Sequence, residues 1–337
     1  MLNSYVFSAF LLKTIRIGEK DSSMNRPQRA SGQRSARPPG GRFGLHLSTS
    51  FLLLLSTLWP GSVDPTYAAK ASPDQVQIVE FHQYQELLEE FKRQDYQLNN
   101  LNAGVPAIIL KALPENLTAI SSTERKKSIF FQALLPMVLL ANAEIAKERA
   151  TLLTLKKALV KQPQLTPAQS RSLAQLTRKY KLNTQPPLDA STINQLLPRI
   201  DTIPVDLALA QAAIESAWGT SRFARLGNNL FGQTTQIQGE GIIPRDRPAQ
   251  ATYEIRKFSE PYQSVRAYML NLNSHSHYQE FRQLRAKERA AERDPRATEL
   301  AAGLLSYSTR RQAYVAELRS IIRINKLERF TSAELRQ

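Results

Sequence analysis

Apolar residues recur at intervals of three and four positions along much of the chain, the spacing of one face of an α-helix. On this basis, helices are predicted over residues 74–93, 123–159, 166–181, 204–216 and 262–273. Between them lie a short apolar segment at residues 104–114 and a Pro-containing connection at residues 182–204. The pattern therefore predicts a mainly helical chain.

The most apolar part of these helices is residues 129–140, in which Gln132 is the one strongly polar side chain. A membrane span needs about 20 consecutive apolar residues. This run is shorter, and Lys and Glu residues lie near both of its ends. We therefore interpret it as a buried helix of a globular fold rather than as a membrane span.

Charge adds a second constraint. The 337 residues include 45 Lys and Arg against 29 Asp and Glu, a formal net charge of +16. Nine of the basic and three of the acidic residues lie in residues 1–71, so the remainder is basic as well. Such a charge attracts polyanions, including nucleic acid, acidic lipid headgroups and an anionic wall polymer. There is no cysteine, which excludes disulfides and cysteine-based metal or redox sites.

The amino end has the order of features found in secretory signals. Arginines between Arg26 and Arg42 precede the apolar run 51–59, and small residues follow at 66–71. We interpret residues 24–71 as a cleavable export signal, with an uncleaved anchor as the alternative. Met24 is an alternative start to Met1. Export predicts a periplasmic or envelope-associated protein.

Residues 204–216 carry the clearest chemistry. This helix is apolar nearly all round, so it is expected to be buried, and Glu215 lies in its last turn. Burial and the negative end of the helix dipole both raise the pKa of a carboxyl there. A carboxyl that stays protonated near neutral pH suits general acid catalysis. The alternative is a structural carboxylate paired with Arg222 or Arg225.

Two motifs near Glu215 carry a family resemblance. Glu215-Ser-Ala-Trp-Gly219 is followed by Asn229-Leu-Phe-Gly232. At this spacing they resemble the signature of the glucosaminidase domains of glycoside hydrolase family 73, found in bacterial autolysins and Bax-like proteins. The resemblance covers about residues 190–325, and residues 122–136 look like the upstream helices of the Bax-like subgroup. It implies a mainly α, lysozyme-like catalytic domain with a small β-hairpin lobe, preceded by a helical N-terminal region.

The resemblance also implies an activity and a set of site residues. The family hydrolyses the β-1,4 bond after N-acetylglucosamine in peptidoglycan. Glu215 matches its general acid, and Tyr307 matches a cleft tyrosine with a catalytic role. Tyr314, in the same segment, is interpreted as a packing residue. The expected substrate-binding residues are those of the two motifs: Ser216, Trp218, Asn229 and Phe231.

The second acidic group of the family lies on the β-hairpin, which corresponds to residues 242–258. Glu254 lies in a strand pattern there and is the first choice. Glu240 and the acetamido group of the substrate are the alternatives. Either glutamate can equally be a solvated acid beside the arginines of the hairpin. Whether the reaction retains or inverts the anomeric configuration stays open.

Two further features are assigned no chemistry, and no cofactor is implied. His275 and His277 form a His-x-His pair, interpreted as a loop feature rather than a metal site because no acidic cluster accompanies it. The charged stretch 281–301 is interpreted as a solvated helix face. Aromatic residues are not interleaved with its charges, which disfavours nucleic-acid binding.

The chain is expected to divide into an N-terminal extension with signal peptide (1–71), a helical region (72–182) and a glucosaminidase domain (183–330). The expected partner is a peptidoglycan glycan strand, with membrane contact only through an uncleaved signal. A lytic transglycosylase and a non-catalytic wall-binding scaffold on the same fold are the alternative functions.

Overall fold

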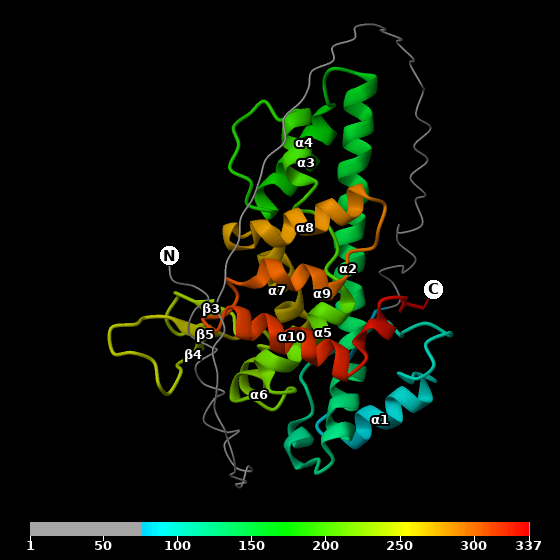
Figure 1. Ribbon diagram of the computed structural model, residues 1–337, viewed down its shortest axis with the longest axis vertical. Helices are drawn as coiled ribbons and strands as arrows, with labels where there is room; N and C mark the ends of the chain where they lie inside the picture. Colours follow the sequence, from blue (N-terminus) through cyan, green and yellow to red (C-terminus); the bar gives the residue numbers. More distant parts are fainter. Residues whose placement is uncertain (1–75, 337) are drawn as a thin grey trace, which may run out of the picture. The chain divides into compact units, whose positions relative to one another are not determined.

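Helices dominate the computed structural model, which describes residues 76–336 (Figure 1). The predicted export signal, residues 24–71, lies outside the described residues. The α-helices of the described part are α1 (Tyr84–Arg93), α2 (Thr123–Lys161), α3 (Pro167–Lys179), α4 (Ala190–Leu196), α5 (Val205–Ser216), α6 (Arg222–Gly227), α7 (Pro261–Ser274), α8 (Gln279–Ala290), α9 (Ala297–Leu300) and α10 (Gln312–Ile324).

Two small sheets and several 3-10 turns complete the fold. In the first sheet, β1 (Gln77–Val79) pairs in parallel with β2 (Ile108–Leu110). In the second, β5 (Glu254–Arg256) lies between β3 (Thr234–Thr235) and β4 (Gly241–Ile242), antiparallel to both. The 3-10 helices are η4 (Glu115–Ala119), η5 (Ser276–Tyr278), η6 (Ala301–Leu304) and η7 (Leu327–Phe330). The expected mainly α, lysozyme-like fold with a small β-lobe is confirmed.

The long helix α2 forms one wall of the hydrophobic core. Its N-cap residue Ser122 accepts a hydrogen bond from the amide of Arg125, which satisfies one free donor of the first turn. Within residues 76–336, α2 is the helix long and apolar enough to span a membrane, but 72% of its most apolar window is buried in the protein. The interpretation of residues 129–140 as a buried helix is confirmed.

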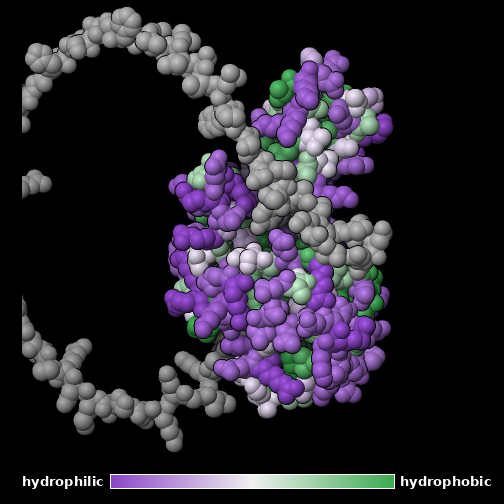
Figure 2. All heavy atoms as spheres, turned by 90° about the vertical axis from the view of Figure 1, so that its right-hand side faces the viewer, coloured by the Kyte–Doolittle hydropathy of each residue, from purple (hydrophilic) through white to green (hydrophobic). Residues whose placement is uncertain are grey.

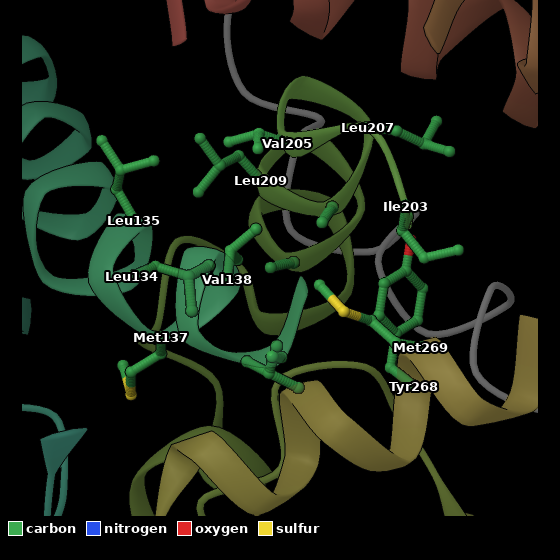
Figure 3. Packing of buried hydrophobic residues seen from close by; sticks show 14 of the residues in the cluster. Leu134, Leu135, Met137, Val138, Ile203, Val205, Leu207, Leu209, Tyr268 and Met269 are labelled. Carbon is green, nitrogen blue, oxygen red and sulfur yellow. The ribbon is translucent and has the colours of Figure 1, made fainter. Parts of the chain in front are cut away.

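Helix α5 lies in the centre of this core. All of its residues are buried, and it packs against α2 and α10. Figure 3 shows Leu134 and Val138 of α2, Val205 and Leu209 of α5, and Met269 of α7 gathered in one cluster. A helix that is apolar nearly all round buries every face in this way, as its sequence predicted.

Two predictions of secondary structure were wrong. Residues 74–93 do not form one helix, because residues 77–79 pair with residues 108–110 as β1 and β2 and the helix starts at Tyr84. The predicted connection 182–204 contains α4. Asp189 starts that helix with a capping box, in which its carboxylate accepts the amide of Thr192.

The prediction of a solvated face for residues 281–301 was wrong for Arg282 and Arg285 of α8, which are buried. Arg285 donates to the carbonyls of Pro198, Asp201 and Thr202, and Arg282 donates to those of Leu272 and His275. Buried arginines are tolerated here because carbonyl groups satisfy their donors. The two arginines bind α8 to the segments before α5 and after α7.

Helix α2 contacts both α5 and α7, so the predicted upstream region and the predicted glucosaminidase domain share one core. Asn142 of α2 adds a polar link, since its side chain exchanges two hydrogen bonds with the backbone of Ile203. The boundary at residues 182 and 183 stays a prediction.

Candidate active site

Glu215 lies in the last turn of α5, and only 8% of the residue is exposed. Burial raises the pKa of its carboxyl from 4.5 to about 7. A hydrogen bond with Tyr314 and the charge of Arg310 lower the pKa, whereas the charge of Glu317 raises it. The desolvation predicted for this position is therefore the main effect, and the carboxyl is partly protonated at neutral pH.

A chain of buried polar side chains leads to Glu215. The Tyr268 hydroxyl donates to Gln211 Oε1 at 2.7 Å, and Gln211 Nε2 donates to the Tyr314 hydroxyl at 2.9 Å. Tyr314 in turn hydrogen-bonds to Glu215. Tyr314 packs in the core, as interpreted, and in addition its hydroxyl joins Glu215 to this chain. Gln211 was the available signal, since it is the polar residue one turn before Glu215 in an otherwise apolar helix.

The backbone reverses directly after the acid. Ala217, Trp218 and Gly219 all have positive φ, at 49°, 59° and 76°. For a non-glycine residue this conformation costs roughly 1–3 kcal/mol. Ser216 holds the reversal, because its Oγ donates to the Ala212 carbonyl at 2.6 Å and accepts from the Gly219 amide at 2.8 Å. The left-handed turn that ends α5 begins at Ala217, directly after the helix.

Trp218 connects this reversal to the upstream helix α2. Its ring lies edge-on to those of Phe131 and Phe130, with centroids 5.3 and 6.1 Å apart. The ammonium group of Lys127 lies 4.7 Å from the Trp218 ring centroid, within the range of a cation–π interaction. Residues from α2 therefore hold the segment that follows the acid.

The second motif builds the link between α6 and the β-lobe. Asn229 Nδ2 donates to the carbonyls of Gln233 and Arg256 at 2.8 and 2.9 Å, and its Oδ1 accepts the amides of Phe231 and Gln233. The Phe231 ring stacks on Tyr268 at 3.9 Å, with planes 6° apart. Asn229 and Phe231 are both buried.

Three of the predicted substrate-binding residues lie inside the protein. Ser216, Asn229 and Phe231 are buried, and the polar side-chain atoms of Ser216 and Asn229 are bonded to backbone groups. Substrate binding by these three residues stays a prediction. They shape the protein around Glu215, whereas Trp218 keeps part of its surface exposed.

Tyr307 lies close enough to Glu215 for the charge of the carboxylate to affect its pKa, and its catalytic role stays a prediction. Its hydroxyl donates to the Phe231 carbonyl at 3.4 Å, and its ring stacks on Tyr314 at 5.5 Å. Burial raises the pKa of Tyr307 well above its usual value, and the charge of Glu215 raises it further. The hydroxyl therefore stays protonated.

Glu254 lies on β5 with 5% of the residue exposed. Its carboxylate accepts the amide of Gly239 at 3.0 and 3.1 Å and that of Gly241 at 2.8 Å. The Gly239 hydrogen bond is the main reason that its pKa is lowered. Glu254 is thus ionised and connects strand β5 to the loop that carries the rival candidate Glu240, which is exposed.

The cation that acts on Glu215 is one that the sequence did not suggest. Arg310 lowers the pKa of Glu215 and pairs with Glu317 of α10, whereas Arg222 donates to the carbonyl of Ile243. Neither Arg222 nor Arg225 forms an ion pair with Glu215 within residues 76–336. Arg310 and Glu317 lie nearly 100 residues downstream of Glu215, and only the fold brings them close.

The two histidines form a local contact. The amide of His277 donates to His275 Nδ1 at 3.2 Å, across the start of η5. Within residues 76–336, no group of three or more His, Asp or Glu side chains is arranged to hold a metal ion.

Comparison with known proteins defines the class of this chain. Residues 190–327 match the family described as mannosyl-glycoprotein endo-beta-N-acetylglucosaminidase, a glucosaminidase domain of the glycoside hydrolases. The matched residues contain Glu215, Glu254 and Tyr307. The domain implies a glycan substrate.

A relative extends the comparison upstream. The chain is 32% identical over 225 residues to Protein bax of Escherichia coli (strain K12), over 66% of this chain and 75% of that protein. The chain therefore belongs to the Bax-like glucosaminidase-domain family. No solved structure matches it.

Proposed function

We propose that this protein is an exported hydrolase that cleaves the β-1,4 bond after N-acetylglucosamine in peptidoglycan, with Glu215 as its general acid. The carrying observation is the pKa of about 7 of a buried carboxyl at the end of α5. A group with this pKa is protonated often enough to donate, and its conjugate base is stable enough to form, at neutral pH. Such tuning of one carboxyl in a protein core is typical of catalytic acids.

In the proposed reaction, Glu215 donates its proton to the glycosidic oxygen as the bond to the anomeric carbon breaks. Tyr314, Gln211 and Tyr268 hold the carboxyl in one orientation through their chain of hydrogen bonds. Arg310 lies near enough to stabilise the carboxylate that remains after proton transfer. The contacts of Trp218 with Phe130 and Phe131 of α2 keep this end of α5 in place.

The positive charge that develops on the sugar ring needs a second group. Glu254 is our first choice because its pKa is lowered, so it is ionised where Glu215 is protonated. Two carboxyls whose environments separate their pKa values in this way divide the roles of acid and base. Both Glu254 oxygens accept amide hydrogens of the lobe, which leaves assistance by the substrate acetamido group as the alternative.

Product analysis tests the proposal. Purified peptidoglycan is digested, and the fragments are identified by mass spectrometry with and without reduction. A hydrolase of the proposed specificity gives fragments with a reducing N-acetylglucosamine end. Reducing N-acetylmuramic acid ends would contradict the proposed bond, and the absence of any cleavage would support the scaffold alternative.

The same digest separates the candidates for the second group. Glu254→Gln is compared with Glu240→Gln, an exposed residue of the same lobe. If Glu254 takes part in the chemistry, its variant loses activity while remaining folded, and the Glu240 variant stays active. Full activity of a folded Glu254→Gln variant would leave the acetamido group as the assisting group.

A lytic transglycosylase is the second candidate, because it works with one catalytic acid and Glu254 is bound to backbone amides. Its product is an anhydro sugar, which has no reducing end and a mass lower by one water.

The proposed location is tested by fractionating cells of the native host. Recovery of a chain shortened at residues 66–71 in the envelope fraction is expected, and recovery of the full chain in the cytosol would contradict export.

A further inference from the structure

The C-terminal half of α2, together with α3, concentrates positive charge that the proposed active site does not use. Between Glu148 and Asp189 the chain has eight basic residues and no acidic one. Two of the eight are paired, Arg149 with Asp201 and Lys179 with Glu148. The remaining six are exposed and form no ion pair within the part of the chain that the structure describes: Lys156, Lys157, Lys161, Arg171, Arg178 and Lys181.

Three of these lysines share one face of α2 with two exposed apolar side chains. Val160 is 83% exposed and Leu153 is 38% exposed. Starting from Leu153, the exposed positions follow at three, four, seven and eight residues, the spacing of one helix face. We call this face the basic tip, defined as Leu153, Lys156, Lys157, Val160 and Lys161.

The opposite face of the same turns packs on the protein. Leu152 and Leu155 are buried in the core cluster, and α3 and α4 both contact α2. The basic tip is therefore the outer side of a supported helix and not a frayed end. The dipole of α2 favours a cation in its last turn, which accounts for Lys161 but not for the exposed apolar side chains.

The basic tip lies at the end of α2 that is far from the part of the helix near Glu215. In Figure 1 the C-terminal end of α2 lies near the top with α3 and α4, while α6 and β3–β5 lie in the lower half. The upper end of Figure 2 shows hydrophilic residues with scattered apolar ones between them. At 1.5 Å per residue, Val160 lies roughly 45 Å along the helix from Phe130 and Phe131, which contact Trp218.

The side chains of the basic tip fit one class of partner. Lysines beside exposed aliphatic residues on a helix face match a surface with anionic headgroups above an apolar layer. Single-stranded nucleic acid is bound through aromatic stacking, and between Glu148 and Asp189 the one aromatic residue is Tyr180, which is buried. We infer that the basic tip binds the anionic phospholipid surface of a membrane, with Val160 entering the headgroup boundary.

This contact would hold the hydrolase at a membrane surface. Glu215 would stay away from that surface, because it lies near the opposite part of α2. It is separate from the predicted export signal and does not depend on the proposed catalytic role of Glu215. Binding and catalysis can therefore be measured independently in one preparation.

A local probe tests the inference without interference from other parts of the chain. The chain has no cysteine, so Val160→Cys can be labelled at one position with an environment-sensitive fluorophore. The control is Ile324→Cys, at a residue of α10 that is 65% exposed. The label at 160 should shift to shorter wavelength on vesicles of phosphatidylglycerol and phosphatidylcholine. It should not respond to phosphatidylcholine alone, and the label at 324 should respond to neither.

Charge removal gives the second arm. With the label at 160, Lys156→Gln, Lys157→Gln and Lys161→Gln together should weaken vesicle binding about 100-fold, at about five-fold per lysine. The matched control replaces three lysines that are exposed elsewhere: Lys92, Lys287 and Lys326. In this control, the label at 160 should still respond to the vesicles.

Three outcomes would overturn the inference: equal responses at both labels, equal loss in both lysine variants, or a label at 160 that responds to muropeptides or DNA but not to vesicles. Cleavage of soluble glycan fragments by the same variants reports separately on the proposed function. It is expected to be unchanged.

Discussion

At the scale of single residues, the burial that suits Glu215 for catalysis also destabilises the fold. Its pKa is raised from 4.5 to about 7, so the native state binds the proton more tightly than the unfolded chain. Stability contributed by the protonated form is present below the unfolded pKa and is lost as the pH rises to 7. Each pKa unit corresponds to about 1.4 kcal/mol, so ionised Glu215 costs roughly 3 kcal/mol at alkaline pH.

Glu215→Gln is therefore expected to stabilise the protein in a pH-dependent manner. The free energy of unfolding should rise by about 3 kcal/mol near pH 8 and change little near pH 4.5, where wild-type Glu215 is protonated. Urea unfolding of both proteins at the two pH values measures this difference. An equal change at both pH values would show that the carboxyl is not desolvated.

Burial is the main cause of the raised pKa of Glu215, and the hydrogen bond with Tyr314 lowers that pKa in part. Tyr314→Phe removes a contact that lowers the pKa of Glu215, so the pKa should rise and the alkaline limb of kcat/KM should move to higher pH. Tyr262→Phe is the matched control, because Tyr262 donates to Glu144 outside the site. A shifted pH profile in the control would argue against this role, and so would an alkaline limb at lower pH in Tyr314→Phe.

Sequence alone predicted the position and the raised pKa of Glu215, because both depend on its own helix. The roles of Arg310, Tyr314 and Glu317 could not be predicted, since they lie on a distant segment that only the packing of α10 against α5 brings to the acid. Ser216 and Asn229 were predicted as substrate contacts because they belong to the motifs. Both are buried and bonded to backbone groups, a structural role that the motifs alone did not indicate.

At the scale of elements, the segment after α5 depends on glycine. Gly219 has φ +76°, and a Cβ added there would lie 2.7 Å from Leu113 Cδ1 and 3.1 Å from Phe130. It therefore combines backbone strain with a clash against the upstream region. Gly239 has a similar φ of +86° but no atom within 4 Å of an added Cβ.

Gly219→Ala is expected to lower the free energy of unfolding by about 1–3 kcal/mol more than Gly239→Ala, because only Gly219 adds a clash to the strain. It should also reduce kcat, since the reversal directly follows Glu215. Paired melting curves and rates on the same substrate measure both effects. Equal stability losses in the two variants would mean that Leu113 and Phe130 move aside freely.

Long elements were easier to predict than short ones. The helices α2, α5 and α7 have enough turns for their periodicity to be visible. Strand β1 has three residues, and its parallel partner lies about thirty residues away, so no local pattern marked it. Helix α4 is also short, although the capping pair Asp189 and Thr192 marks its start in the sequence.

At the scale of the whole molecule, α2 makes the upstream region part of the catalytic unit. Its residues pack on α5 and α7, and its rings hold Trp218. The described residues are therefore expected to unfold in one cooperative transition in calorimetry, with equal calorimetric and van't Hoff enthalpies. Two separated transitions would show that the upstream region and the glucosaminidase domain are independent.

The most direct measurement compares peptidoglycan digestion by wild type and Glu215→Gln, with fragments identified by mass spectrometry and folding verified by the melting temperature. We predict fragments with reducing N-acetylglucosamine ends from wild type, and a loss of at least about 100-fold in rate for the folded variant, the lower range for a missing general acid. Cleavage by Glu215→Gln at the wild-type rate would contradict the assignment of Glu215 as the catalytic acid.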